Sequence, residues 1–320
     1  MSTAVLSREE IMLFHLKKRY VCMSPITFID RSTGAHITET PPGEGFLRFL
    51  YHNPFGKLAL EALVKRKFLS SWYGRRMSAE KSARSISSFV ETHGIDMSEA
   101  VHPIDSFASF NDFFYRKLKP EARPIGDGFV SPADGKLIAF QQINDLTDFY
   151  VKGEPFTVES FLRNASLAKQ YEGGSMIIVR LAPNDYHRYH FPASGVAAKS
   201  VLINGDYLSV SPYAVRGNFA RVFCQNKREY TVLETASYGP VVISPVGATM
   251  VGSIHRSYEA GSSISKGDEM GYFSFGGSSL LLLIPEGKLT IDQDLIEHTR
   301  QGKETFVKMG ETIGQPIVSL

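Results

Sequence analysis

Two glycines followed by two hydroxyl side chains stand near the end of this 320-residue chain, in the order Gly276-Gly277-Ser278-Ser279. Glycine tolerates strained dihedral angles that bring a carbonyl within reach of the next side chain. Attack of the Ser278 oxygen on the Gly277 carbonyl would break the peptide bond and leave an ester. β-Elimination and hydrolysis would then turn position 278 into a pyruvoyl group, a built-in electrophile. The same residues also suit a turn at a strand end, so other motifs must decide between the two readings.

Two further stretches carry groups suited to acid–base chemistry. Residues 185–192 read Asp-Tyr-His-Arg-Tyr-His-Phe-Pro, and residues 131–135 read Ser-Pro-Ala-Asp-Gly. With the glycine–serine motif they resemble, in the same order, the three signature motifs of the phosphatidylserine decarboxylase family. The resemblance covers residues 107–288 and includes Phe113-Phe114-Tyr115-Arg116-Lys117-Leu118, Arg123-Pro124-Ile125, Gly205-Asp206-Tyr207-Leu208 and the stretch 245–254. Several long motifs in one order are highly specific.

The resemblance implies roles for four residues. Asp134, His190 and Ser278 match the family's self-processing triad, in which a histidine oriented by a carboxylate activates a serine hydroxyl. His187 is the expected acid that returns a proton to the substrate α-carbon. The implied activity is decarboxylation of phosphatidylserine to phosphatidylethanolamine, with the pyruvoyl group at position 278 as electron sink and no external cofactor. A cut between Gly277 and Ser278 would give chains of residues 1–277 and 278–320.

Two alternatives at the site stay open. His187 and His190 are spaced to bind zinc as a pair, but no third ligand is close in sequence and we expect no metal. Many bacterial members of the family carry Leu-Gly-Ser-Thr at the cut, whereas this chain has Gly-Gly-Ser-Ser. The Gly-Ser bond survives this change. Because Ser278 directly follows glycine and matches the family register, we expect it rather than Ser279 to be the nucleophile.

The elements that must position these residues indicate an α+β fold. Apolar runs over residues 176–181, 241–244 and 280–284 predict strands of a mainly antiparallel or mixed β-sheet. We expect residues 106–320 to form this catalytic core. Residues 1–105 are expected to be helical and to associate with a membrane, and they include a polar helix over residues 78–92.

A basic, amphipathic segment over residues 46–76 is the candidate membrane contact. Phe55 and Leu58 lie on its apolar face, and Lys65-Arg66-Lys67 and Trp72 follow. A helix packed on the core would show the same pattern. In an interfacial segment, bulky groups sink to headgroup depth and each nearby cation adds about 1 kcal/mol against anionic lipid.

Composition limits where the protein works and what it binds. Net charge is +2, which does not suggest nucleic acid as a partner. Residues 1–20 lack the apolar core of a signal peptide, and no run approaches the roughly 20 apolar residues of a spanning helix. The two cysteines, Cys22 and Cys224, show no redox spacing, and a reducing compartment is the default. The resemblance implies a homodimer bound peripherally to anionic lipid, on the cytoplasmic face of a bacterial cell membrane.

Three other classes of protein could carry these residues. A soluble pyruvoyl-dependent decarboxylase would act on a free amino acid. A serine hydrolase would use the same residue types uncut, but the sequence around Ser278 lacks the Gly-x-Ser-x-Gly elbow. A non-catalytic β module would use its glycine-rich hairpins only to turn strands.

Overall fold

The computed structural model describes residues 26–39, 74–145, 156–210, 215, 219–248, 253–276 and 278–317. Strands dominate these residues, and the helices are short. The strands are β1 (Thr27–Asp30), β2 (His36–Thr38), β3 (Phe129–Val130), β4 (Gly135–Phe140), β5 (Ser175–Leu181), β6 (Arg188–His190), β7 (Gly195–Ala197), β8 (Val201–Ile203), β9 (Arg228–Thr235), β10 (Gly239–Val246), β11 (Ile254–Arg256), β12 (Ser263–Ile264), β13 (Glu269–Phe273), β14 (Ser278–Ile284), β15 (Leu289–Ile291), β16 (Glu304–Val307) and β17 (Thr312–Pro316). The helices are α5 (Ile86–His93), α6 (Phe110–Phe114), α8 (Val158–Leu162), α9 (Ala165–Ala168), α11 (Phe219–Gln225) and α12 (Gln293–Arg300).

One large sheet organises the described residues. Its 11 strands run in the order β12-β7-β9-β10-β14-β5-β4-β16-β1-β2, with β8 paired to β9. The pairs are antiparallel except for β1 with β16, so the sheet is mixed. Two three-stranded sheets, β11-β13-β6 and β15-β17-β3, accompany it. The predicted α+β class with a mixed β core is confirmed.

Both faces of the large sheet are buried at its central strands, which explains the continuous apolar runs there. In β14, Leu280 and Leu282 belong to one core cluster, while Leu281 and Leu283 belong to another on the opposite face. The first cluster includes residues of β6, β13 and α12, and the second includes residues of α8 and α11. The three predicted strands are confirmed as β5, β10 and β14.

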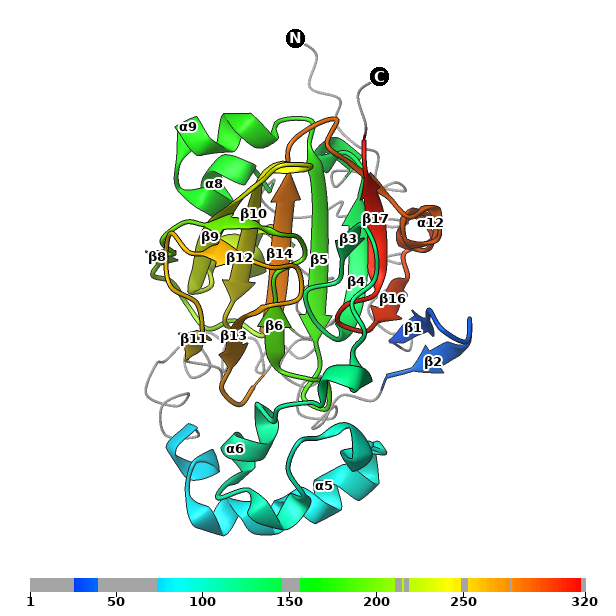
Figure 1. The fold of residues 1–320 in the computed structure, drawn as a ribbon, viewed down its shortest axis with the longest axis vertical. Helices are drawn as coiled ribbons and strands as arrows, with labels where there is room; N and C mark the ends of the chain where they lie inside the picture. The colour runs from blue at the N-terminus through cyan, green and yellow to red at the C-terminus, as the bar shows by residue number, and fades with distance from the viewer. Residues whose placement is uncertain are drawn as a thin grey trace, which may run out of the picture.

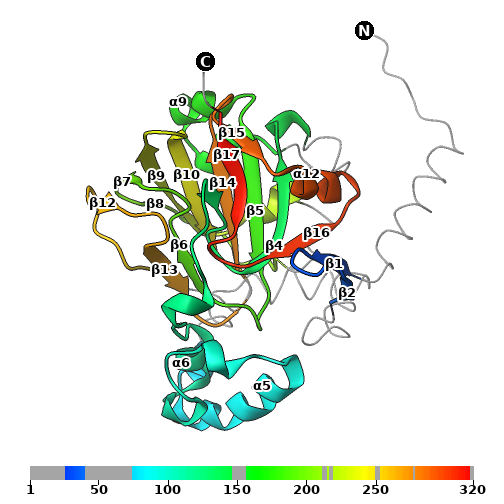
Figure 2. The ribbon, with the colours of Figure 1, turned by 45° about the vertical axis from the view of Figure 1, so that its right-hand side comes forward.

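A small helical layer lies beyond one end of the sheet. In Figures 1 and 2, α5 and α6 sit below the sheet, at the end from which β14 starts. Their apolar side chains form a third cluster, which includes Phe110, Phe113 and Phe114 and is joined by Phe275 from the loop before β14. This layer therefore reaches the chain next to Ser278.

The N-terminal region differs in part from the helices that we expected throughout residues 1–105. Residues 80–93 are helical, first as a 3₁₀ turn and then as α5. However, β1 and β2 form a hairpin that extends the large sheet through parallel pairing with β16. Gly34, with φ of 70°, turns the chain between them, and β-branched residues suit the strands. In the described part of the chain, no helix combines the length and the apolar character needed to cross a membrane.

Candidate active site

Ser278 starts a central strand and is fully buried. Its backbone pairs with Leu181 of β5, and its side chain shares a face of the sheet with Leu280. Gly276 has φ of 138°, a conformation that residues with a side chain rarely adopt. Gly277 lies outside the described residues. The serine is therefore fixed by the strand ladder, two positions after a glycine whose φ other residues rarely adopt.

The two neighbouring serines face opposite sides of the sheet. Ser278 Oγ lies 3.3 Å from His187 Nδ1. Ser279 Oγ is buried and has no hydrogen-bond partner within the part of the chain that the structure describes. The geometry thus favours Ser278 as the reacting hydroxyl, although it remains a proposal that this residue reacts.

His187 is held as a hydrogen-bond acceptor toward Ser278. Its Nε2 lies 2.9 Å from the carbonyl oxygen of Ala182, which can only accept, so Nε2 carries the ring hydrogen. Nδ1 of the neutral ring then accepts from the Ser278 hydroxyl. The ring of Phe114 stacks on the imidazole with centroids 3.8 Å apart. Helix α6 and the turn after β5 therefore fix this ring together.

The surroundings of His187 oppose its protonation. Complete burial is the largest cause, and it lowers the pKa of His187 to about 3. The positive charges of Arg116 and Lys136 lower this pKa further. His187 is therefore neutral in the uncut chain at physiological pH.

A buried ion pair supports the turn that orients His187. Lys136 Nζ lies 2.9 Å from both carboxylate oxygens of Asp185. Asp185 Oδ2 also accepts from the backbone N–H of Ala182 at 2.7 Å. Because Ala182 offers its carbonyl to His187, this pair acts as a positioning device. Asp185 belongs to the motif at residues 185–192, so the sequence pointed to it. Lys136 lies in β4, and nothing in the sequence singled it out.

His190, at the end of β6, uses both ring nitrogens within the fold. Nδ1 donates to the carbonyl oxygen of Gly267 at 2.9 Å, so Nε2 accepts from the Tyr186 hydroxyl at 3.1 Å. Burial lowers the pKa of His190, while the carboxylates of Glu269 and Asp134 act in the opposite direction. His190 is thus a neutral ring with carboxylates nearby.

Asp134 lies in the loop between β3 and β4 and is bound to an arginine. Arg123 donates to both of its carboxylate oxygens, the shortest contact being 2.6 Å. The backbone N–H of Met309 donates to Oδ1 at 2.8 Å. Arg123 also contacts Glu99 at 2.9 Å. Arg123 belongs to the motif Arg123-Pro124-Ile125, but the sequence did not indicate that it pairs with Asp134.

The structure brings the predicted triad into one region without joining its members directly. Within the described residues, no hydrogen bond connects His190 with Asp134 or with Ser278; the contact to Ser278 belongs to His187. The loop of Asp134 and the strand of His190 are adjacent, since the His190 N–H donates to the carbonyl of Pro132. The assignment of Asp134, His190 and Ser278 as a triad therefore remains a proposal.

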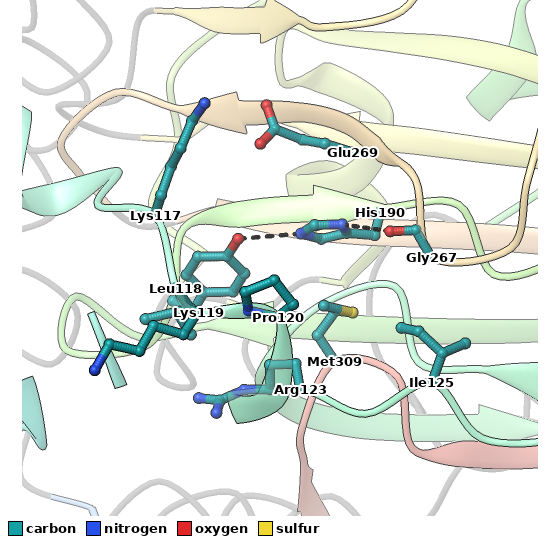
Figure 3. A pocket seen from close by; sticks show the side chains of 11 residues that line it. Lys117, Leu118, Lys119, Pro120, Arg123, Ile125, His190, Gly267, Glu269 and Met309 are labelled. Carbon is teal, nitrogen blue, oxygen red and sulfur yellow. Dashed lines mark hydrogen bonds between the residues drawn. The ribbon is translucent and has the colours of Figure 1, made fainter. Parts of the chain in front are cut away.

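A surface pocket of about 290 Å³ reaches His190 but not Ser278. It is lined on one side by Lys117 and Lys119, and His190 and Glu269 lie across from them (Figure 3). His187 and Ser278 have no exposed surface. The pocket therefore opens the edge of the site to solvent, while Ser278 is closed off from it.

The predicted membrane contacts lie outside the described residues. They are Phe55, Leu58, Lys65, Arg66, Lys67 and Trp72. Their role stays a prediction from the sequence.

Comparison with known proteins places these motifs in a family. Residues 110–315 match the family model described as phosphatidylserine decarboxylase. The chain is 53% identical over 292 residues to a phosphatidylserine decarboxylase proenzyme of Fusobacterium nucleatum, covering 90% of this chain and 97% of the relative. The chain belongs to the phosphatidylserine decarboxylase family. The predicted resemblance is confirmed, and the chain is an enzyme of the carboxy-lyase class.

Other phosphatidylserine decarboxylase proenzymes match over the same share of the chain. Those of Desulfitobacterium hafniense and Chlamydia muridarum are 42% and 43% identical, and each match covers 90% of this chain. The match covers 98% of the first relative and 96% of the second. The family model spans Asp134, His187, His190 and Ser278, so the whole predicted site lies within the region typical of phosphatidylserine decarboxylases.

Proposed function

We propose that this chain is a proenzyme that cuts itself between Gly277 and Ser278 and then decarboxylates phosphatidylserine to phosphatidylethanolamine. The observation that carries the proposal is the Ser278 hydroxyl, which is buried at a strand start and donates a hydrogen bond to His187 Nδ1, 3.3 Å away. Membership of the decarboxylase family and relatives described as proenzymes support it.

The cut follows from the chemistry of Ser278 and its neighbours. A base takes the hydroxyl proton, Oγ bonds to the Gly277 carbonyl carbon, and the peptide C–N bond breaks to leave an ester and a free amine at residue 278. Loss of the α-proton then breaks the Cβ–O bond and releases the Gly277 carboxylate. Tautomerisation and addition of water release ammonia and leave the pyruvoyl group. The residues on either side of the cut fit this group, because Gly276 has a positive φ that glycine adopts readily and Ser278 is buried at a strand start.

Electrostatics favour His190 as the base for this cut. An imidazole surrounded by cations is a poor proton acceptor, and His187 has Arg116 and Lys136 nearby. His190 has the carboxylates of Glu269 and Asp134 nearby, which stabilise its protonated form. In the uncut chain, His187 then orients the hydroxyl. His190 receives the proton once its hydrogen bond with Tyr186 opens.

In the mature enzyme, the pyruvoyl carbonyl supplies the electron sink for the pair released when carbon dioxide leaves. His187 lies against position 278 and is placed to return a proton to the substrate α-carbon. The negative charges of a bound phospholipid would raise the pKa of His187 above its low value in the uncut chain. Substrate binding thus favours the protonated form of His187, which can then deliver its proton.

Mass spectrometry under denaturing conditions tests the proposal. The purified protein should give two chains divided at Gly277 and Ser278, the smaller one lighter than its serine-started form by the mass of ammonia. The cut protein should release carbon dioxide from phosphatidylserine. Ser278→Ala should stay whole and inactive. A folded parent chain that remains whole would contradict self-cleavage.

The substrate class has its own test, because a soluble pyruvoyl-dependent decarboxylase would mature in the same way. Phosphatidylserine vesicles and free L-serine are offered to the cut enzyme, and we expect carbon dioxide only from the lipid. Turnover of serine alone would favour the soluble alternative.

Membrane and subunit partners complete the proposal. We infer a peripheral protein on the cytoplasmic face of a bacterial membrane and a homodimer with two chains per protomer. Charge reversal of Lys65, Arg66 and Lys67 should weaken sedimentation with anionic vesicles if this segment is the contact. Equal sedimentation of parent and variant would remove the segment from the proposal.

A further inference from the structure

Arg116 is a buried cation that has no hydrogen-bond or ion-pair partner among the residues that the structure describes. It follows α6, and its side chain is 6% exposed. Its Nε is buried without a hydrogen-bond acceptor, and its guanidinium forms no hydrogen bond or ion pair with any residue that the structure describes. The other buried arginines of the described chain all have acceptors, namely Arg123 on Asp134, Arg180 on Glu39 and Glu304, Arg188 on Glu269, and Arg228 on backbone carbonyls.

The guanidinium lies within the candidate active site. Its charge lowers the pKa of His187, and it interacts electrostatically with Asp134 and Asp185. The face of Phe113 lies 5.0 Å from its central carbon. Phe114, two positions before Arg116, stacks on His187. One short segment thus holds both Arg116 and the ring that stacks on His187.

The nearby carboxylates do not neutralise Arg116. Asp134 is bound by Arg123, and Asp185 by Lys136, each at hydrogen-bond distance. Among the cations of this group, Arg116 is therefore the one that no described carboxylate contacts. An unpaired charge in a protein interior is strongly unfavourable unless something compensates it. The missing partner is an anion that this part of the chain does not supply.

We propose that Arg116 binds the phosphodiester of the phospholipid headgroup. This inference rests on the proposed function and names the residue that holds the substrate. A phosphodiester carries a full negative charge, and its oxygens match the planar fork of a guanidinium.

The phosphodiester fits better than the other anion of the substrate, the carboxylate. The carboxylate loses its charge as carbon dioxide leaves, so a cation bound to it would stabilise the ground state more than the transition state. The phosphodiester keeps its charge from substrate to product. Beside His187, the rings of Phe114 and Phe275 supply an apolar wall, which suits a departing neutral molecule.

Variants of Arg116 test the assignment through binding. Glycerophosphoethanolamine carries the phosphodiester without a carboxylate, and L-serine carries the carboxylate without a phosphodiester. In the cut Arg116→Met protein, we expect calorimetry to show at least tenfold weaker binding of glycerophosphoethanolamine than in the cut parent. L-Serine should compete with phosphatidylserine as strongly as it does in the parent. KM for phosphatidylserine should rise at least tenfold, with a smaller change in kcat. Arg116→Lys, which keeps the charge but not the fork, should recover part of the affinity.

Arg228→Met is the matched control, because Arg228 is also buried but donates to the carbonyl oxygens of Phe161, Cys224 and Asn226. We expect it to lower the melting temperature and to leave KM unchanged. Arg116→Met should leave the melting temperature equal or higher, since it removes an unpaired buried charge.

Unchanged glycerophosphoethanolamine binding in Arg116→Met would overturn the assignment, and a selective loss of L-serine competition would assign Arg116 to the carboxylate instead. Calorimetry does not require turnover, so an inactive parent would contradict the proposed function alone.

Discussion

At the scale of single residues, two histidines three positions apart have opposite electrostatic surroundings. His187 has cations nearby and touches Ser278, whereas His190 has carboxylates nearby and touches Tyr186 and Gly267. A base needs surroundings that stabilise its protonated form, and a proton donor to the substrate needs to lie at position 278. Charge favours His190 as the base and position favours His187 as the proton donor, which is the division of roles that we propose.

Paired alanine variants test this division of roles. We expect His190→Ala to leave most of the chain uncut, because Ser278 loses its base. His187→Ala should be cut but should release carbon dioxide at least 100-fold more slowly, in line with the usual contribution of general acid catalysis. Intact mass follows the cut, and carbon dioxide release follows the reaction. A cut His190→Ala together with an uncut His187→Ala would reverse the roles.

The low pKa of His187 also predicts how stability depends on pH. An unfolded histidine titrates near its ordinary pKa of 6.5, whereas folded His187 has a pKa of about 3. Between these values the unfolded chain binds more protons, so acid favours unfolding. From pH 7 to pH 5, His187 should lower the free energy of unfolding by about 2 kcal/mol.

Urea unfolding of the uncut Ser278→Ala chain at both pH values measures this loss. The same chain with His187→Gln serves as the comparison, and it should lose about 2 kcal/mol less than the Ser278→Ala chain. Equal losses in the two chains would mean that His187 titrates normally in the fold.

The residues themselves were predictable where a motif marked them, and their partners were not. Asp134, His187, His190 and Ser278 stand out by type and spacing. The bonds from Arg123 to Asp134 and from Lys136 to Asp185 depend on which strands become neighbours, which no local pattern reports. That Arg116 has no hydrogen-bond acceptor among the described residues becomes visible only once its burial and its neighbours in the fold are known.

At the scale of elements, the central strands follow from their apolar runs, while the N-terminal hairpin does not. A sheet buried on both faces leaves a continuous apolar signal, as in β14, and such runs are easy to recognise. The hairpin of β1 and β2 has only seven strand residues, and β2 is exposed, so its sequence has little periodicity. Its strand state comes from pairing with β16, more than 260 residues later in the chain.

The junction before β14 offers a prediction about backbone geometry. Gly276→Ala places a side chain at φ of 138°, at a cost on the order of 1–3 kcal/mol, and the strain should shift the Gly277 carbonyl relative to Ser278. We expect self-cleavage to slow at least tenfold, as followed by gel electrophoresis of freshly folded protein. Gly287→Ala is the control, because Gly287 also has positive φ, of 70°, with open space around it. That variant should be cut at the parental rate, and equal rates for both variants would contradict the prediction.

At the scale of the whole molecule, the cut would fall inside the large sheet rather than between two lobes. The segment after the cut supplies β14, which lies between β10 and β5 in the middle of the sheet (Figure 1). It also supplies β16, which lies between β4 and β1. Removal of the smaller chain would expose four inner strand edges, those of β10, β5, β4 and β1. The two chains should therefore form one inseparable folded unit.

Unfolding experiments test this unit directly. The cut protein should elute as one species containing both chains under native conditions, and the chains should separate only in denaturant. Its unfolding midpoint in urea should rise with protein concentration, because unfolding releases two chains, and mass action then favours the folded complex at high concentration. The protomer of the uncut Ser278→Ala variant is a single chain, so release of the smaller chain should not make its urea midpoint depend on protein concentration. If the small chain can be washed from the large one without denaturant, β14 does not hold the position in the mature enzyme that it holds in the uncut chain.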